Sequence, residues 1–117
     1  MSKPIRWVLA VEITPAQLDN FRLVVKDLVA FTHEEPGTLG YEFYLSEDNA
    51  VCHIYERFAD SAAILAHGAT FAKYAERFLA ACKPVRFEVY GNPSAEARAA
   101  IGDLKPIYFP YLAGFTR

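Results

Sequence analysis

The chain has 117 residues, a net charge of −2 and a hydrophobic fraction of 53%, and only 22% of its residues are charged. This composition excludes a disordered chain, and the length suits one domain that needs no disulfide or metal to fold. The chain has 12 basic and 14 acidic residues, and its basic residues do not cluster in one run. This argues against a nucleic-acid partner held by phosphate contacts. No apolar stretch approaches the length of a membrane span, so we expect no membrane partner.

The two cysteines, Cys52 and Cys82, fit no metal-ligand spacing and are too few for a disulfide framework. The apolar run from Trp7 to Val11 is too short for a signal peptide. We therefore expect buried, reduced thiols in a cytoplasmic protein.

Every second residue over the range 5–13 is a large apolar one, and this period of two predicts a first strand with one apolar face. That face carries Ile5, Trp7, Leu9, Val11 and Ile13. A helix is then predicted from Thr14, with Thr14 as the cap, Pro15 at the first helical position and Gln17 closing a capping box. It is expected to end near residues 32–33, because Pro36 and Gly37 follow.

Residues 39–46 and 50–58 predict two strands joined by the short turn at residues 47–49, and hence an antiparallel hairpin. In the second of these strands, the alternation places Cys52, Ile54, Glu56 and Phe58 on one face.

A second helical stretch is predicted after a cap at Asp60 or Ser61, interrupted at Gly68 and resumed from Thr70. Pro84 is expected to end it, and residues 85–90 alternate as a fourth strand.

Asn92-Pro93 predicts another helix start, with a short helix to about Ile101 and Gly102 as its stop. Residues 105–112 are aromatic and contain two prolines, so they cannot form a central strand, yet they are too apolar to lie free in water. We expect an ordered, extended tail that packs across a dimer or over a pocket mouth.

The order strand, helix, strand, strand, helix, strand predicts an α+β, ferredoxin-like fold, in which helices cover one face of a four-stranded antiparallel sheet. We expect residues 1–91 to form this domain and residues 92–117 to pack on it or on a partner subunit. The uncovered face would include Val8, Tyr44, Val51, Tyr55 and Tyr90. A monomer rarely leaves such a face in water, so a homodimer is predicted.

Two segments resemble the antibiotic biosynthesis monooxygenase family. Residues 35–42, EPGTLGYE, resemble its EPGxxxYE signature, and Glu56-Arg57-Phe58 with Ala66-His67 resembles its ExW strand end and its histidine-containing helix. Phe58 stands where the family often has Trp. The serine, proline and histidine that often follow are replaced by residues 68–71.

This resemblance implies a dimeric α+β barrel with an apolar pocket between the sheet and the helices of each subunit. Family members include cofactor-free monooxygenases that oxidise phenols and quinols, and the resemblance therefore implies no cofactor. The same fold hosts haem degraders, isomerases and proteins without known activity, so fold alone does not fix the chemistry.

His67 follows Ala63 and Ile64 on the helix face that is expected to look inward, where an imidazole could accept a phenolic proton. Glu56 shares its strand face with apolar residues and must find a partner or become protonated. It could orient His67, or it could instead form a salt bridge with a neighbour of Arg57 or with Arg86 on an adjacent strand. The structural alternative for His67 is a half-buried histidine bonded to a backbone carbonyl.

A set of aromatic residues could line a pocket for a flat substrate ring, although each is also a candidate for the core. They are Trp7, Tyr41, Phe43, Phe58, Phe71, Tyr74 and Phe87. His53 is expected at the subunit interface, with a place in the pocket as the alternative, and His33 is expected in a solvated helix cap. The spread of the three histidines over separate elements argues against a metal site.

The sequence thus predicts a cofactor-independent monooxygenase for a small phenolic or quinol-like substrate, with His67 as base and Glu56 as its orienter. The alternatives are a non-catalytic dimer that binds an apolar ligand, and an isomerase or degradative enzyme for a small carbonyl metabolite.

Overall fold

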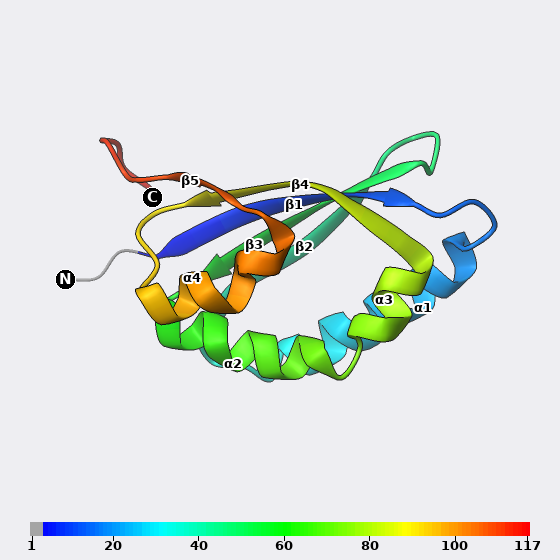
Figure 1. Ribbon diagram of the computed structural model, residues 1–117, viewed down its shortest axis with the longest axis horizontal. Helices are drawn as coiled ribbons and strands as arrows, with labels where there is room; N and C mark the ends of the chain where they lie inside the picture. The colour runs from blue at the N-terminus through cyan, green and yellow to red at the C-terminus, as the bar shows by residue number, and fades with distance from the viewer. Residues whose placement is uncertain (1–3) are drawn as a thin grey trace.

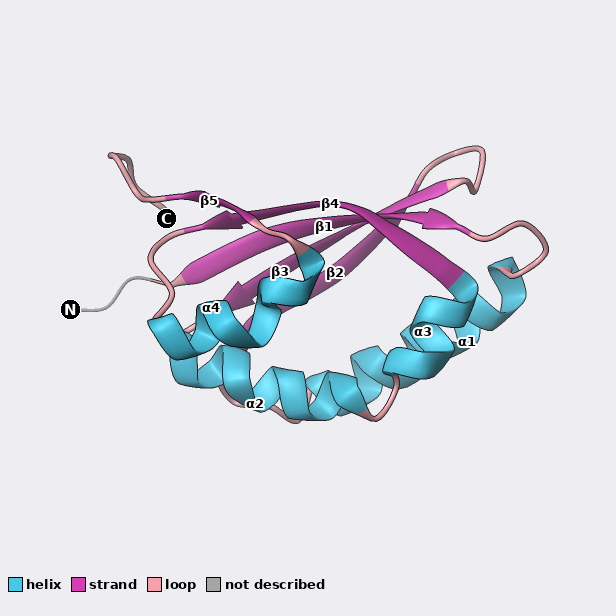
Figure 2. Ribbon diagram, in the orientation of Figure 1, coloured by secondary structure: helices cyan, strands magenta, loops and turns pink. Residues whose placement is uncertain are grey.

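A computed structural model describes residues 4–117 of the chain as a sheet with helices packed on one of its faces (Figures 1 and 2). The elements in chain order are β1 (Ile5–Ile13), α1 (Leu18–Thr32), β2 (Thr38–Leu45), β3 (Val51–Phe58), α2 (Ser61–Ala72), α3 (Ala75–Ala81), β4 (Cys82–Tyr90), α4 (Ala95–Ile101), a 3₁₀ turn (Gly102–Leu104) and β5 (Ile107–Phe109). The strand order is β2-β3-β1-β4-β5. The predicted α+β, ferredoxin-like arrangement is confirmed, and the sheet gains a fifth strand that pairs parallel with β4.

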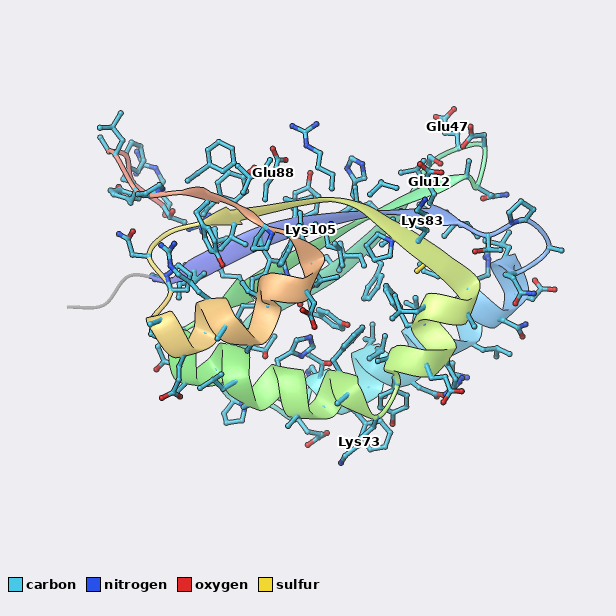
Figure 3. The ribbon with its side chains drawn as sticks, in the orientation of Figure 1. Glu12, Glu47, Lys73, Lys83, Glu88 and Lys105 are labelled. Atoms are coloured by element: carbon cyan, nitrogen blue, oxygen red, sulfur yellow. The ribbon has the colours of Figure 1, made fainter. Side chains whose placement is uncertain are left out.

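The core lies between the sheet and the helices, and β1 supplies its central row of side chains. Ile5, Trp7, Leu9 and Val11 are all buried, as their alternation predicts. Because β1 pairs antiparallel with β3 on one side and with β4 on the other, this apolar row continues into both neighbours. Figure 3 shows side chains filling the layer between sheet and helices, while Glu88 lies on the opposite side of the sheet and Lys73 points away from the helical layer.

The predicted start of α1 is wrong: Pro15 was expected at the first helical position, and the helix begins three residues later, at Leu18. Residues 14–17 form a turn in which Gln17 N donates to Thr14 O over 2.9 Å, and Ala16 has a positive φ of 68°. That conformation is outside the helical region, so the helix begins only at Leu18, and Gln17 precedes it without a side-chain cap.

The predicted interruption at Gly68 is also wrong. Helix α2 continues through Gly68 to Ala72, and the break falls at Lys73 and Tyr74 before α3. A single glycine costs a helix only about 1 kcal/mol, which the buried face of α2 offsets. Of the two predicted caps of this helix, Asp60 and Ser61, Asp60 is the N-cap residue: its Oδ1 accepts a hydrogen bond from Ala63 N over 2.9 Å.

Strand β4 begins at Cys82, before the proline that was expected to precede it. Pro84 lies inside the strand opposite Val11, at a register shift that leaves Val85 out of the pairing and 47% exposed. Strand β5 pairs only with residues 88–90, so the other side of β4 is an edge at Pro84, where a missing N–H donor is tolerated.

Helix α4 packs on the rest of the chain, whereas residues 109–117 are exposed, so the tail rings are not buried on this chain as the sequence predicts. Helix α4 is capped by Ser94, whose Oγ accepts from Ala97 N over 3.1 Å, rather than by the predicted Asn92. Ala97 and Ile101 belong to the main buried cluster. The guanidinium of Arg98 in α4 lies 4.0 Å from the centre of the Tyr108 ring in β5, and Phe109 stacks on Tyr90.

Gly37 permits the close approach of the β2 turn to α2, and this predicts opposite effects for two glycine substitutions. A Cβ at Gly37 would lie 2.6 Å from the Cβ of Ala63, whereas a Cβ at Gly68 would meet nothing within 4 Å. We expect Gly37→Ala to lower the free energy of unfolding by about 1–3 kcal/mol. The control, Gly68→Ala, should raise it by up to about 1 kcal/mol because alanine favours the helix. Urea denaturation checks both, and equal stability of Gly37→Ala and the wild type would contradict the close packing.

Candidate active site

His67 is held at the inner face of α2. The Asp60 cap starts this helix directly after β3, so His67 falls almost two turns later, on the face that also buries Ala63 and Ile64. Its side chain points toward the sheet, and the residue is only 5% exposed.

Two carboxylates flank the imidazole, one at each nitrogen. His67 Nδ1 lies 3.1 Å from Glu35 Oε1, and His67 Nε2 lies 3.2 Å from Glu56 Oε1. The proximity of Glu56 to His67 agrees with the expectation from the sequence. The alternative partner, Arg86, instead donates to Glu88 over 2.8 Å.

Glu35 is the site residue that sequence reasoning missed. It precedes Pro36 and Gly37 in the turn before β2, and its Oε1 also accepts a hydrogen bond from Thr38 Oγ1 over 2.8 Å. The available signal was its place at the head of the EPG signature. Sequence spacing alone does not show that this turn faces α2, since Glu35 and His67 are 32 residues apart.

Both carboxylates keep an oxygen without a well-aligned donor. Among the described residues, Glu35 Oε2 and Glu56 Oε1 are buried and have no hydrogen-bond partner, although Glu56 Oε1 is within 3.2 Å of the imidazole. A buried acceptor left unsatisfied costs free energy, so Glu35 Oε2 is ready to accept a hydrogen bond, whereas Glu56 Oε1 already faces His67 Nε2. We call Glu35, His67 and Glu56 the carboxylate–histidine cluster.

The cluster favours the protonated form of His67. Burial by itself lowers the pKa of His67, but the hydrogen bond and charge of Glu56 and the charge and hydrogen bond of Glu35 together raise it above its ordinary value. When His67 is protonated, its imidazolium lies between the two carboxylates.

This shift predicts a pH dependence of stability. A group whose pKa is raised in the folded state contributes stability below its unfolded pKa of 6.5, and that contribution is lost as the pH rises through the folded pKa. We therefore expect the stability difference between wild type and His67→Gln to shrink between about pH 6 and about pH 9. Urea unfolding at both pH values checks this, and a constant difference would contradict it.

Three of the predicted aromatic residues surround the imidazole. Ring centroids lie 5.2 Å from His67 for Tyr41, 5.5 Å for Phe58 and 6.5 Å for Phe71. Burial, followed by the charge of Glu56, raises the pKa of the Tyr41 phenol well above its ordinary range. Tyr41 is therefore a neutral hydrogen-bond donor beside the cluster.

The remaining predicted aromatic residues lie farther from His67. Trp7 packs on the far side of Phe58 at 4.6 Å and contacts Phe87, and all three are core residues. Phe43 is half-buried and reaches the cluster only through Tyr41, at 4.9 Å. Tyr74 pairs with Phe31 at 5.6 Å, at the break between α2 and α3.

The structure has hollows elsewhere. One, of about 410 Å³, lies on the uncovered sheet face and includes Tyr44, His53 and Tyr55. The other, of about 940 Å³, lies between the start of β1 and the C-terminal tail. The rings around His67 are packed together, so a substrate must displace the half-buried ones to reach the cluster.

Within residues 4–117, no group of three or more His, Cys, Asp or Glu side chains is arranged to bind a metal ion. In the carboxylate–histidine cluster the carboxylates approach opposite ring nitrogens and do not converge on one point. Over the same residues, no helix is long and apolar enough to cross a bilayer.

The sheet face opposite the helices remains uncovered, as the sequence predicts. Tyr44 and Tyr55 are 54% and 45% exposed and pack edge to face, and Tyr90 is 38% exposed. His53 is exposed on the same face, between Ala10 and Tyr44 on the neighbouring strands.

Sequence comparison decides the family. The profile of the antibiotic biosynthesis monooxygenase family matches residues 4–84, which include the whole carboxylate–histidine cluster. The chain belongs to this family. A search of curated protein sequences gives no match.

Solved structures with this fold resemble the chain. MupZ from Pseudomonas fluorescens is 24% identical, with a TM-score of 0.85 over 100% of this chain and 91% of MupZ. A Caulobacter crescentus protein, provisionally named an antibiotic biosynthesis monooxygenase, is 26% identical, with a TM-score of 0.67 over 75% of this chain and 88% of its own. SnoaB from Streptomyces nogalater, named a cofactor-independent oxygenase, is 14% identical, with a TM-score of 0.67 over 80% of this chain and 97% of SnoaB.

Proposed function

We propose that the protein is a cofactor-independent monooxygenase that oxidises a small phenolic or quinol-like substrate. Its family membership supports oxygenase chemistry. The observation that carries the proposal is the buried carboxylate–histidine cluster, which can accept a proton without a metal or a cofactor.

Substrate deprotonation is the step that such a cluster can assist. A phenol or quinol that loses its proton becomes an electron-rich anion, which can donate electrons to dioxygen. One oxygen atom then enters the ring, the other leaves as water, and the ring supplies the electrons. A base positioned within hydrogen-bond distance contributes about 10²–10⁴-fold to such a step.

The proposed base is the whole cluster. The sequence assigns this role to His67 with Glu56 as its orienter, and the two carboxylates that flank the imidazole extend the role to the cluster. Glu35 Oε2, which is buried and has no hydrogen-bond partner among the described residues, is the free acceptor, and His67 holds both carboxylates in place. Each proton that the cluster accepts makes its charge less negative by one unit.

The proposed substrate ring lies among Tyr41, Phe58 and Phe71, with access past two half-buried residues, Phe43 of β2 and Tyr74 between α2 and α3. A flat ring suits this environment, since aromatic pairs gain from edge-to-face and offset contacts. The neutral Tyr41 hydroxyl can donate a hydrogen bond to the phenolate that forms.

Oxygen consumption tests the function. With an apolar quinol, and with chelator present but no added flavin, the protein should consume one dioxygen per quinol. Quinol binding without oxygen consumption would favour the non-catalytic binder. Turnover of a small carbonyl compound without oxygen consumption would favour the isomerase or degradative alternative.

We propose further that the protein is a homodimer joined through the uncovered sheet face. A stable interface buries more than roughly 1,000 Å² in total, and the exposed tyrosines of this face supply apolar area. Light scattering at micromolar concentration should give a dimer for the wild type and a monomer for Tyr55→Glu, which adds a charge beside Glu42 on the paired strand. The control Leu23→Lys, on the exposed face of helix α1, should remain dimeric. A monomeric wild type would contradict the proposal.

A further inference from the structure

Helix α1 ends on a buried threonine. The buried face of this helix carries Phe21, Val24, Leu28 and Thr32. The first three are apolar, and Thr32 follows Leu28 by one turn, at a position where the spacing of the face predicts another apolar side chain. Thr32 is only 1% exposed. A hydroxyl buried at such a position needs a hydrogen-bond partner, because without one it lowers the stability of the fold.

The Thr32 hydroxyl has no such partner within the part of the chain that the structure describes. Thr32 Oγ1 is buried without a hydrogen bond, and so is Glu35 Oε2. Both side chains belong to the turn that follows α1, in which Glu35 N donates to Thr32 O over 2.9 Å. The turn therefore holds an unused buried donor and an unused buried acceptor. A group that satisfies both must accept one hydrogen bond and donate another, as a hydroxyl does.

The phenol of Tyr41 lies beside these two atoms. Tyr41 of β2 is opposite Glu56 of β3, and its ring is 5.2 Å from the imidazole of His67. Burial and the charge of Glu56 raise the pKa of the Tyr41 phenol, and the nearby Thr32 hydroxyl opposes this rise, although it is not aligned for a hydrogen bond. The charge of Glu35 also acts on the phenol. Two hydroxyl donors thus lie near one free carboxylate oxygen.

We infer that Thr32 is a second donor to the substrate: its hydroxyl and that of Tyr41 both donate to the phenolic oxygen that loses its proton to Glu35. This inference rests on the proposed function and adds a residue to the same site. Loss of the proton leaves a negative charge on that oxygen, and hydrogen-bond donors fixed in a buried site stabilise such an oxyanion. Thr32 is part of the core between sheet and helices, away from the sheet face proposed for the homodimer.

Thr32→Val tests the unused hydroxyl without any ligand. Valine keeps the shape of the side chain and removes the polar atom. If the hydroxyl has no partner in the free protein, the variant should unfold at the same or a higher urea concentration than the wild type. Unfolding at a lower urea concentration would mean that the hydroxyl bonds to the protein or to a structural water, and it would overturn the inference.

Anaerobic titration with a nitrophenol tests the contact with the ligand. Thr32→Val should raise the pH at which the bound phenol ionises by about one unit, because the lost donor favours the phenolate. Thr32→Ser keeps the hydroxyl and should restore the wild-type value. The control Thr70→Val, at a half-buried position of α2, should leave the ionisation unchanged. Nitroanisole has no proton to give to Glu35 Oε2, so it should bind the wild type at least about tenfold more weakly than the nitrophenol.

The results separate a failure of this inference from a failure of the proposed function. If Tyr41→Phe shifts the ionisation of the bound nitrophenol and Thr32→Val does not, the inference is overturned while the proposed function stands. If Thr32→Val shifts the ionisation but the wild type consumes no oxygen with a quinol, the site binds a phenolate as inferred and the proposed oxidation is wrong. A wild type that binds no nitrophenol would overturn both.

Discussion

His67→Ala should lower the rate of quinol oxidation by about 10²-fold or more while the protein stays folded. The substitution removes the imidazole that lies between Glu35 and Glu56 and leaves two buried carboxylates facing each other. Oxygen consumption, measured beside circular dichroism to verify folding, gives the result.

The matched control is His33→Ala, at the exposed end of α1, which should retain full activity. Glu35→Gln and Glu56→Gln separate the cluster from a single-residue base. If the cluster shares the proton, each should lower the rate. If His67 alone were the base, Glu35→Gln would have little effect on the rate, and unchanged activity in His67→Ala would leave this histidine with a structural role.

Phe58→Ala should have the largest effect on stability, lowering the free energy of unfolding by about 3–5 kcal/mol. Phe58 is 0% exposed and packs between Trp7 and His67, so its removal opens a cavity that neither ring can fill. Urea denaturation measures the loss.

Phe115→Ala is the control, because Phe115 is 80% exposed and its removal should change stability by less than about 0.5 kcal/mol. The milder Phe58→Leu keeps most of the volume and should fold, so it shows whether the ring itself matters for activity. A cost below about 1 kcal/mol for Phe58→Ala would contradict the tight packing around the cluster.

The spacing of apolar residues in the sequence predicts the layers of this fold, because each strand buries its apolar face against the helices. The alternation in β1 and the hairpin of β2 and β3 place Ile5, Trp7 and Phe58 on the inner face, where the structure has them. The family signature adds the dimeric barrel as an expectation.

Local signals predict the boundaries less well, because tertiary packing outweighs them. Gly68 remains inside α2 since the buried face of that helix offsets its low propensity, and Pro84 remains inside β4 since it lies at an edge. Strand β5 has only three residues, too few to show an alternation of apolar and polar residues, so the sequence does not predict it. It forms because the tail packs against β4.

Only part of the candidate site can be predicted from the sequence. His67 and Glu56 stand out because polar residues on apolar faces need partners. Glu35 does not, since it lies in a turn among other acidic residues and no periodicity tells which way a turn side chain points. Tertiary contacts bring the turn to α2 and Glu35 to His67: Gly37 packs against Ala63, and Ala59 N donates to Gly37 O over 2.9 Å.

The most direct measurement of the central claim is the protonation state of a bound phenol in the absence of oxygen. A nitrophenol changes its absorbance on losing its proton, so an anaerobic titration reports the transfer itself. We predict that the wild type binds it as the phenolate below the pH at which the free phenol ionises, and that Glu35→Gln combined with Glu56→Gln binds it as the neutral phenol. A neutral phenol on the wild type, or equal phenolate on both proteins, would contradict the proposal that the carboxylate–histidine cluster takes the substrate proton.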